Sequence, residues 1–252
     1  MTRVLVTVAH PDDETFGTGS VIAAAAAAGA EVVVCCATRG EAGEAPDLAP
    51  GEDLGAVREA ELRAAGSLLG ASRIVLLDYG DSGMSGDAAP GTLAAAPLAD
   101  VAGRLAEVIG DVEPDIIVTL DPEFGDGHRD HIAIGRATIE AAESYPDVRL
   151  YAWVLPRRLL AKWFAEVERL RPDSEHLDLD KSGIGRPDDD ITTVLDTAHL
   201  RPLRERASAL HATQTPPTDG MSEEIAAGFM EHDYLIRLRP PWRGGEPETS
   251  IF

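Results

Sequence analysis

The chain has 252 residues, of which 44% are hydrophobic, and this combination is typical of one globular domain and excludes a disordered protein. Acidic residues outnumber basic ones by 44 to 22, so the formal net charge is −22. A surface this acidic repels phosphate backbones and anionic lipids, and we expect neither nucleic acid nor a membrane as a partner. No apolar stretch could span a bilayer, and the N-terminus lacks a basic segment followed by an apolar one, so we expect a cytoplasmic protein.

The first two-thirds of the chain alternates apolar runs with helical patterns. Strands are predicted at the apolar runs, which are residues 3–8, 31–37, 73–77, 115–120 and 148–154. Helices are predicted between them, at residues 14–28, 53–69, 97–109 and 130–143. Continuous Val, Ile and Leu runs separated by helices favour a parallel sheet that is covered on both faces. The predicted fold is therefore α/β: a Rossmann-like, doubly wound, mainly parallel sheet with helices on both faces.

The last third of the chain is expected to complete the same domain. We expect one domain over residues 1–252, divided into a sheet-containing core, C-terminal elements with a flap, and a tail, at 1–155, 156–240 and 241–252. The flap is the polar stretch 172–190, which contains Pro and Gly. A late strand in "ITTVLDT" (191–197) and a helix at 199–212 follow it.

In a doubly wound sheet, the ligand site lies beyond the C-terminal ends of the strands. Four segments of this sequence are predicted there, and each carries acidic residues: 9–14, 38–52, 78–96 and 121–130. The chemistry is therefore expected in these segments. Specificity is expected to come from loops 39–52 and 78–96 and from the flap 172–190.

The first cluster of titratable side chains follows the first predicted strand. "HPDDE" places His10, Asp12, Asp13 and Glu14 within five residues. Neighbouring carboxylates repel one another, and a bound cation would stabilise them. The alternative is a simple helix cap, since the helix dipole favours acidic residues in a first turn.

The second cluster follows the fourth predicted strand, in "GDGHRDHIAIGRA". His128 and His131 are three residues apart, with Asp130 between them. The two histidines could be only a surface pair. Otherwise, the first and second clusters should converge on one cleft at the ends of parallel strands. Two such clusters fit one Zn²⁺ per chain, held by His, Asp and His with one position left for water. A second Asp could then act as general base, and a further His could stabilise an oxyanion.

The motifs "AHPDDE" and "GHRDH", with the strand order between them, resemble the LmbE-like or PIG-L family of zinc-dependent N-deacetylases. The similarity runs to about residue 143 and continues more weakly into "LRERASALHATQ". It implies that His10, Asp13 and His131 bind zinc. It also implies that Asp12 is the general base and that His128 is the acid or oxyanion stabiliser.

The resemblance implies roles for further residues. Glu14 and Asp130 would contact the metal ligands and hold them in place without binding the metal. Alternatively, Glu14 would cap the helix. Two stretches resemble the actinobacterial branch that handles mycothiol and its precursor: "AVREAEL" places Arg58 at a substrate-binding arginine, and "GDSGM" places Asp81 at a sugar-binding aspartate. Asp126 stands where that branch has a tyrosine, and we include it among the candidate substrate-binding residues.

Several of these positions have simpler interpretations. Arg58 could pair with Glu61 on its own helix, and Asp81 could only cap a turn. Arg129 replaces the usual proline of the second motif. His211, in "ALHATQ", could approach the site or cap a helix.

The resulting functional prediction is a zinc-dependent hydrolase that removes an N-acyl group, in the first instance acetyl, from a small amino-sugar or glycoconjugate substrate. One alternative is an amidase that acts on a mycothiol-like conjugate or a natural-product intermediate. Another is a small-molecule-binding relative that has lost catalysis. A nucleotide-binding protein or oxidoreductase is disfavoured, because "HPDDETFG" follows the first strand in place of G-x-G-x-x-G. The sequence leaves a monomer and a homo-oligomer both open.

Overall fold

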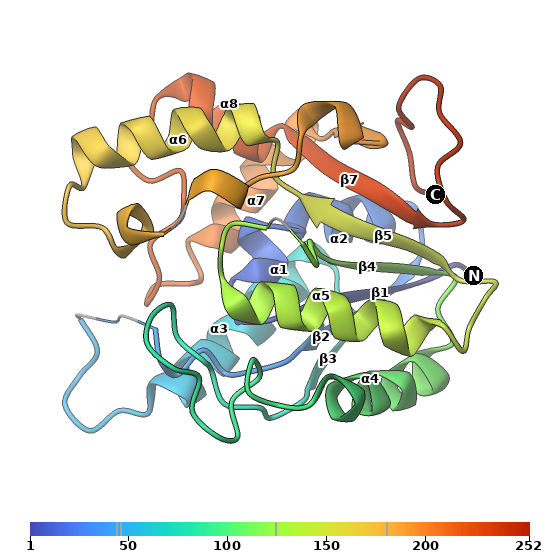
Figure 1. Ribbon diagram of the computed structural model, residues 1–252, viewed down its shortest axis with the longest axis horizontal. Coiled ribbons are helices and arrows are strands. Elements are labelled where there is room, and N and C mark those ends of the chain that lie inside the picture. Colours follow the sequence, from blue (N-terminus) through green and yellow to red (C-terminus); the bar gives the residue numbers. More distant parts are fainter. Residues whose placement is uncertain (44, 46, 124, 180) are drawn as a thin grey trace.

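The computed structural model describes residues 1–43, 45, 47–123, 125–179 and 181–252. Its centre is a seven-stranded sheet in the order β3-β2-β1-β4-β5-β7-β6 (Figure 1). The strands are β1 Arg3–Val8, β2 Glu31–Cys36, β3 Arg73–Leu76, β4 Ile116–Leu120, β5 Arg149–Val154, β6 Thr193–Asp196 and β7 His232–Arg239. The strands β1 to β5 are mutually parallel, whereas β7 is antiparallel to both of its neighbours. The predicted α/β fold with a mainly parallel sheet is therefore confirmed.

Helices cover both faces of the sheet, as expected for a doubly wound fold. They are α1 Asp13–Phe16, α2 Gly19–Ala27, α3 Leu54–Leu69, α4 Leu98–Val112, α5 Arg129–Ala142, α6 Arg157–Leu170, α7 Arg201–Ser208 and α8 Glu223–Met230. α4 and α5 pack together on one face, and α2, α3 and α7 pack together on the other. In Figure 1, α5 passes in front of the strands and α2 lies behind them. No helix within the described residues is long and apolar enough to cross a membrane.

The five predicted N-terminal strands are present to within about one residue at each end, because each is an apolar run; β1, β2, β4 and β5 are largely buried, whereas the edge strand β3 is only partly buried. The helix predicted at 14–28 is two helices, α1 and α2, separated around Gly17. A Cβ at Gly17 would lie 2.9 Å from the Asp13 carbonyl oxygen and 3.5 Å from the Trp153 ring. Glycine therefore allows a sharp break here and close packing against β5.

The C-terminal third contains elements that the sequence analysis did not identify. α6, α8 and β7 lie in stretches for which we predicted no element. The late strand is present as β6, and the helix predicted at 199–212 is the shorter α7, preceded by a 3₁₀ turn at Ala198–Leu200. β7 inserts between β5 and β6, so β6 is the outermost strand on this side.

The last residues lie against the sheet, although the sequence analysis expected a tail. The Glu248 N–H donates to the Thr192 carbonyl, and the Val194 N–H donates to the Glu248 carbonyl, both at 2.8 Å. Ile251 is buried, and its carbonyl accepts a hydrogen bond from Arg149. Glu248 therefore pairs with the start of the outer edge of β6, and Ile251 packs back onto the core.

The flap predicted at 172–190 docks onto the loop after β4. It contains the 3₁₀ turns Glu175–Asp178, Lys181–Gly183 and Asp188–Asp190. The Gly185 N–H donates to the Gly125 carbonyl at 3.0 Å, and Arg186 forms a buried ion pair with Asp121 at 2.7 Å. The flap thereby rests on the loop that leads into the second motif.

Candidate metal centre and active site

Two segments at the C-terminal edge of the sheet form the candidate site. β1 ends at Val8, and the chain continues through His10 to Asp12, the residue before α1. β4 ends at Leu120, and the next loop leads to His128, the residue before α5. Because β1 and β4 are hydrogen-bonded neighbours, the structure brings the two predicted clusters together.

Three donor atoms from these clusters converge. Nε2 of His131 lies 3.3 Å from Nδ1 of His10 and 3.2 Å from Oδ1 of Asp13. The other Asp13 oxygen lies 3.6 Å from Nδ1 of His10. Tetrahedral ligand atoms at the usual zinc distances are about 3.3–3.4 Å apart. The spacing and the chemistry of these three side chains therefore fit a tetrahedral metal ion.

The imidazole of His128 lies next to these donors. Its ring centroid is 4.5 Å from that of His10 and 4.8 Å from that of His131, and the three histidines offer ligand atoms within 4.8 Å of one another. Nδ1 of His128 accepts a hydrogen bond from the Asp130 N–H at 3.2 Å. This contact places the proton of the neutral ring on Nε2, where it can be donated.

Carboxylates hold the outer nitrogens of the two proposed ligand histidines. Oδ1 of Asp126 lies 3.0 Å from Nδ1 of His131. Nε2 of His10 lies 3.3 Å from Asp130 and 3.4 Å from Asp81, and these three residues form a second group that could bind a cation. A carboxylate on the outer nitrogen fixes the tautomer and leaves the inner nitrogen free for a metal. Asp130 thus lies where a supporting residue was expected.

The electrostatics favour positive charge on His10 and His131, whereas burial and these two neighbouring histidines lower the pKa of His128 to about 3. Burial lowers the pKa of His131, but Asp126 and Asp13 outweigh it and raise this pKa to about 10. The pKa of His10 is also raised well above its usual value, because hydrogen bonds to Asp13 and Asp130 outweigh its burial. Burial would raise the pKa of Asp13, but His131 and His10 hold it well below the usual range. Positive charge is therefore stabilised where the donor atoms meet.

Asp12 directly precedes the proposed ligand Asp13, and Arg58 holds its carboxylate. Nη2 of Arg58 donates to Oδ2 of Asp12 at 3.0 Å. Burial raises the pKa of Asp12 to about 6, with Arg58 opposing the shift and Asp13 adding to it. A partly buried carboxylate with a pKa in this range is suited to accept a proton.

Arg58, expected at the substrate, is buried behind Asp12. Its guanidinium donates to the carbonyls of Gly40 and Pro11 at 2.6 and 2.7 Å. A Cβ at Gly40 would lie 2.3 Å from Nη1 of Arg58, so only glycine lets the loop close over this side chain. The alternative partner, Glu61, accepts hydrogen bonds from Thr213. Direct substrate contact by Arg58 stays a prediction, and its observed contacts are those of a support for Asp12.

Asp81 and Asp126, also expected at the substrate, contact the ligand histidines. The side chain of Asp81 is 5% exposed, and it accepts from the Gly83 N–H at 2.9 Å, so it caps a turn while lying against His10. Asp126 accepts from the His128 N–H at 3.0 Å. Their contact with a substrate likewise stays a prediction.

Two loops of the rim are tied together by Arg129, the residue that replaces the motif proline. Its guanidinium donates to the carbonyls of Ser85 and Gly86 at 2.6 and 2.8 Å. The loop 78–96 is thereby fixed to the start of α5. This arginine therefore has a structural role at the rim of the site.

The structure also identifies supporting residues in the C-terminal third. Nε2 of His211 lies 2.7 Å from Oε1 of Glu14, and both side chains are buried. Arg204, which the sequence analysis missed, donates to the carbonyls of Thr15 and Phe16 at 3.3 and 2.7 Å. The motif "LRERASALHATQ" pointed to this region, but it did not reveal that the contacts are made to α1.

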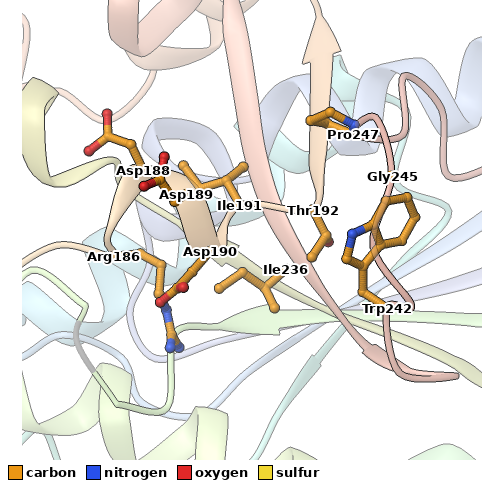
Figure 2. Close-up of a pocket in the computed structure, with 10 residues that line it drawn as sticks. All are labelled: Arg186, Asp188, Asp189, Asp190, Ile191, Thr192, Ile236, Trp242, Gly245 and Pro247. Carbon is orange, nitrogen blue, oxygen red and sulfur yellow. The ribbon is translucent and has the colours of Figure 1, made fainter.

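A separate hollow of 590 Å³ lies between the loop that ends the flap and the C-terminal segment. Figure 2 shows the carboxylates Asp188, Asp189 and Asp190 on one side of it and Trp242 on the other. None of its lining residues belongs to the two motif clusters. The hollow is therefore distinct from the candidate metal centre.

The fold and the site together define an α/β protein with a histidine–aspartate centre at the carboxyl edge of a parallel sheet. The chain belongs to the PIG-L family, described as GlcNAc-PI de-N-acetylase, whose sequence model matches residues 5–142. A 1D-myo-inositol 2-acetamido-2-deoxy-alpha-D-glucopyranoside deacetylase from Acidothermus cellulolyticus is 34% identical over 262 residues, which covers 95% of this chain and 90% of that protein. The family resemblance noted in the sequence is thus confirmed.

Solved structures share the fold at lower sequence identity. The N,N'-diacetylchitobiose deacetylase from Pyrococcus horikoshii superposes with a TM-score of 0.63 at 22% identity, covering 94% of this chain and 84% of that one. The 4-carboxy-2-hydroxymuconate hydratase from Pseudomonas putida superposes with a TM-score of 0.64 at 20% identity, covering 97% and 99%. Since a hydratase and a deacetylase share this fold, the activity has to be argued from the site.

Proposed function

We propose that this chain is a zinc-dependent hydrolase that removes the N-acetyl group of an acetamido sugar. The observation that carries the proposal is the position of His131, whose Nε2 lies 3.3 Å from Nδ1 of His10 and 3.2 Å from Oδ1 of Asp13, close to the spacing of tetrahedral zinc ligands. Bound zinc would polarise the amide carbonyl and lower the pKa of a coordinated water. Membership of a family of de-N-acetylases supports the same reaction.

The chain's own residues would carry the proton transfers. Asp12 directly precedes the proposed ligand Asp13, has one carboxylate oxygen held by Arg58, and is the candidate general base for the attacking water. His128 would donate from Nε2 to the developing oxyanion or to the leaving amine, because its Nδ1 is occupied by the Asp130 N–H. The base would then come from the first motif and the acid from the second.

The carboxylates around the two ligand histidines would hold their imidazole rings in a fixed orientation. Asp126 orients His131 through its outer nitrogen, and Asp130 and Asp81 do the same for His10. Such partners raise the basicity of the ligating nitrogens and hold the rings when the substrate binds. The loops 39–52 and 78–96 and the flap 172–190 would surround the sugar.

The proposed substrate is a glycoside of N-acetylglucosamine, because relatives that match nearly the full length of this chain are named as deacetylases of an inositol-linked acetamido sugar. The strongly acidic chain also supports a small-molecule substrate over a nucleic acid.

The test is to incubate zinc-loaded protein with N-acetylglucosamine, its inositol glycoside and N,N'-diacetylchitobiose, and to quantify the free amine and acetate. The proposal expects equal release of amine and acetate from at least one sugar, with Asp12→Asn as the inactive control. Release of neither product by protein with one equivalent of zinc would refute it.

A further inference from the structure

The backbone of Asp12 adopts a conformation that non-glycine residues rarely populate. Its φ is 130° and its ψ is −31°, and it stands at the junction between β1 and α1. Such strain persists only where the surroundings hold the residue in place.

Glu14 holds the Asp12 peptide. Its Oε2 accepts the Asp12 N–H at 2.9 Å, and its side chain is fully buried. Its Oε1 accepts the hydroxyl of Thr15 and faces Nε2 of His211 at 2.7 Å. The Glu14 carboxylate thus connects the strained Asp12 peptide to His211.

His211 reaches this carboxylate from the far end of the chain, 197 residues away. The backbone N–H of His211 donates to the Ser208 carbonyl at 3.1 Å, so His211 is anchored to the end of α7. Nε2 is its bonded nitrogen, whereas Nδ1 is buried without a partner in the described part of the chain. Arg204 fixes α7 to the carbonyls of Thr15 and Phe16, which keeps His211 in place.

We propose that His211 is a positioning residue that acts through Glu14 on the Asp12 peptide, so that the C-terminal third of the chain sets the orientation of the general base. This inference rests on the proposed function for its catalytic consequence. His211 does not belong to the donor set, and its bonded nitrogen is directed at Glu14 and Thr15. Its effect should therefore fall on the rate of the chemical step.

The two ring nitrogens of His211 allow a matched test. The amide nitrogen of glutamine can occupy the position of Nε2, and that of asparagine the position of Nδ1. His211→Gln should keep kcat within about threefold, whereas His211→Asn and His211→Ala should lower kcat by about 10- to 100-fold, with KM and zinc content unchanged. Thr213→Val is the control, because it removes a hydrogen bond in the same segment without touching Glu14.

A second measurement is independent of activity. In the zinc-loaded protein, the amide hydrogen of Asp12 should exchange slowly in the wild type, His211→Gln and Thr213→Val, and faster in His211→Asn and His211→Ala. NMR-detected exchange would show this. If the wild type proves inactive but this pattern holds, only the proposed deacetylase activity fails. Equal loss of kcat in the Gln and Asn variants, or unchanged exchange at Asp12 in all variants, would overturn the positioning role.

Discussion

Nη2 of Arg58 donates a hydrogen bond to Oδ2 of Asp12 across 3.0 Å, and the two residues are 46 positions apart in the sequence. The same guanidinium binds two backbone carbonyls and is nearly excluded from solvent. A buried arginine of this kind fixes the direction of the carboxylate that it contacts. The neighbourhood of the proposed base is therefore built from three distant parts of the chain.

Arg58→Ala is expected to lower kcat by about 10- to 100-fold, because Asp12 loses the contact that orients it. The loss should be similar for an amino-sugar substrate and for a minimal N-acetyl amide without a sugar, since the contact concerns the base. Steady-state kinetics on both substrates would check this. A loss confined to the sugar substrate would instead support the substrate-binding role predicted from the sequence.

His10→Ala should remove most of the bound metal, because it deletes one of three converging donors. Elemental analysis of protein purified without added metal should give close to one equivalent in the wild type and little in the variant. His232→Ala is the matched control, because this histidine is exposed on β7. Retention of metal by the His10 variant would show that the donor set is assigned wrongly.

Asp12→Asn should leave the metal in place and lower kcat by about 10²- to 10⁴-fold, because it removes the base but spares the ligands. His128→Ala should have a smaller effect of the same kind. Zinc content and kcat measured on the same preparations separate the two roles. Loss of zinc in His128→Ala would identify this histidine as a ligand, an arrangement that its proximity to His10 and His131 would allow.

Arg204→Ala should destabilise the protein by about 3 kcal/mol, because the buried carbonyls of Thr15 and Phe229 and the partly buried carbonyl of Phe16 lose their donor. Urea unfolding followed by circular dichroism would measure the free energy of unfolding. Arg206→Ala on the same helix is the control, since that side chain is exposed and its removal should cost little. Equal effects of the two substitutions would show that the buried contacts contribute nothing specific.

The parallel half of the sheet could be predicted because each of its strands is a continuous apolar run, as in "VLVTV" and "IIVTL". β7 reads "HDYLIRLR", in which charged residues interrupt the apolar ones, and it is half-exposed along much of its length. That mixture is also typical of a helix or a loop. Its insertion between β5 and β6 depends on pairing between segments about 80 residues apart, which local patterns do not encode.

The candidate site was predictable to the extent that its residues follow strands. His10 and His131 could be placed together because β1 and β4 end at the same edge of the sheet. The direction in which Arg58 points could not be derived from its position on α3, because it depends on Gly40 leaving room for the guanidinium. The contact between Glu14 and His211 is likewise a product of tertiary packing.

The residues near the C-terminus that lie along β6 have a consequence for association. A bare outer strand presents unpaired N–H and carbonyl groups to which a strand of another molecule can add. Here Glu248 uses both of its backbone groups on Thr192 and Val194, and Thr193 binds its carboxylate. The start of this edge is therefore not available for strand addition, and shortening the chain before residue 246 would expose these unpaired groups on an otherwise strongly acidic, self-repelling molecule.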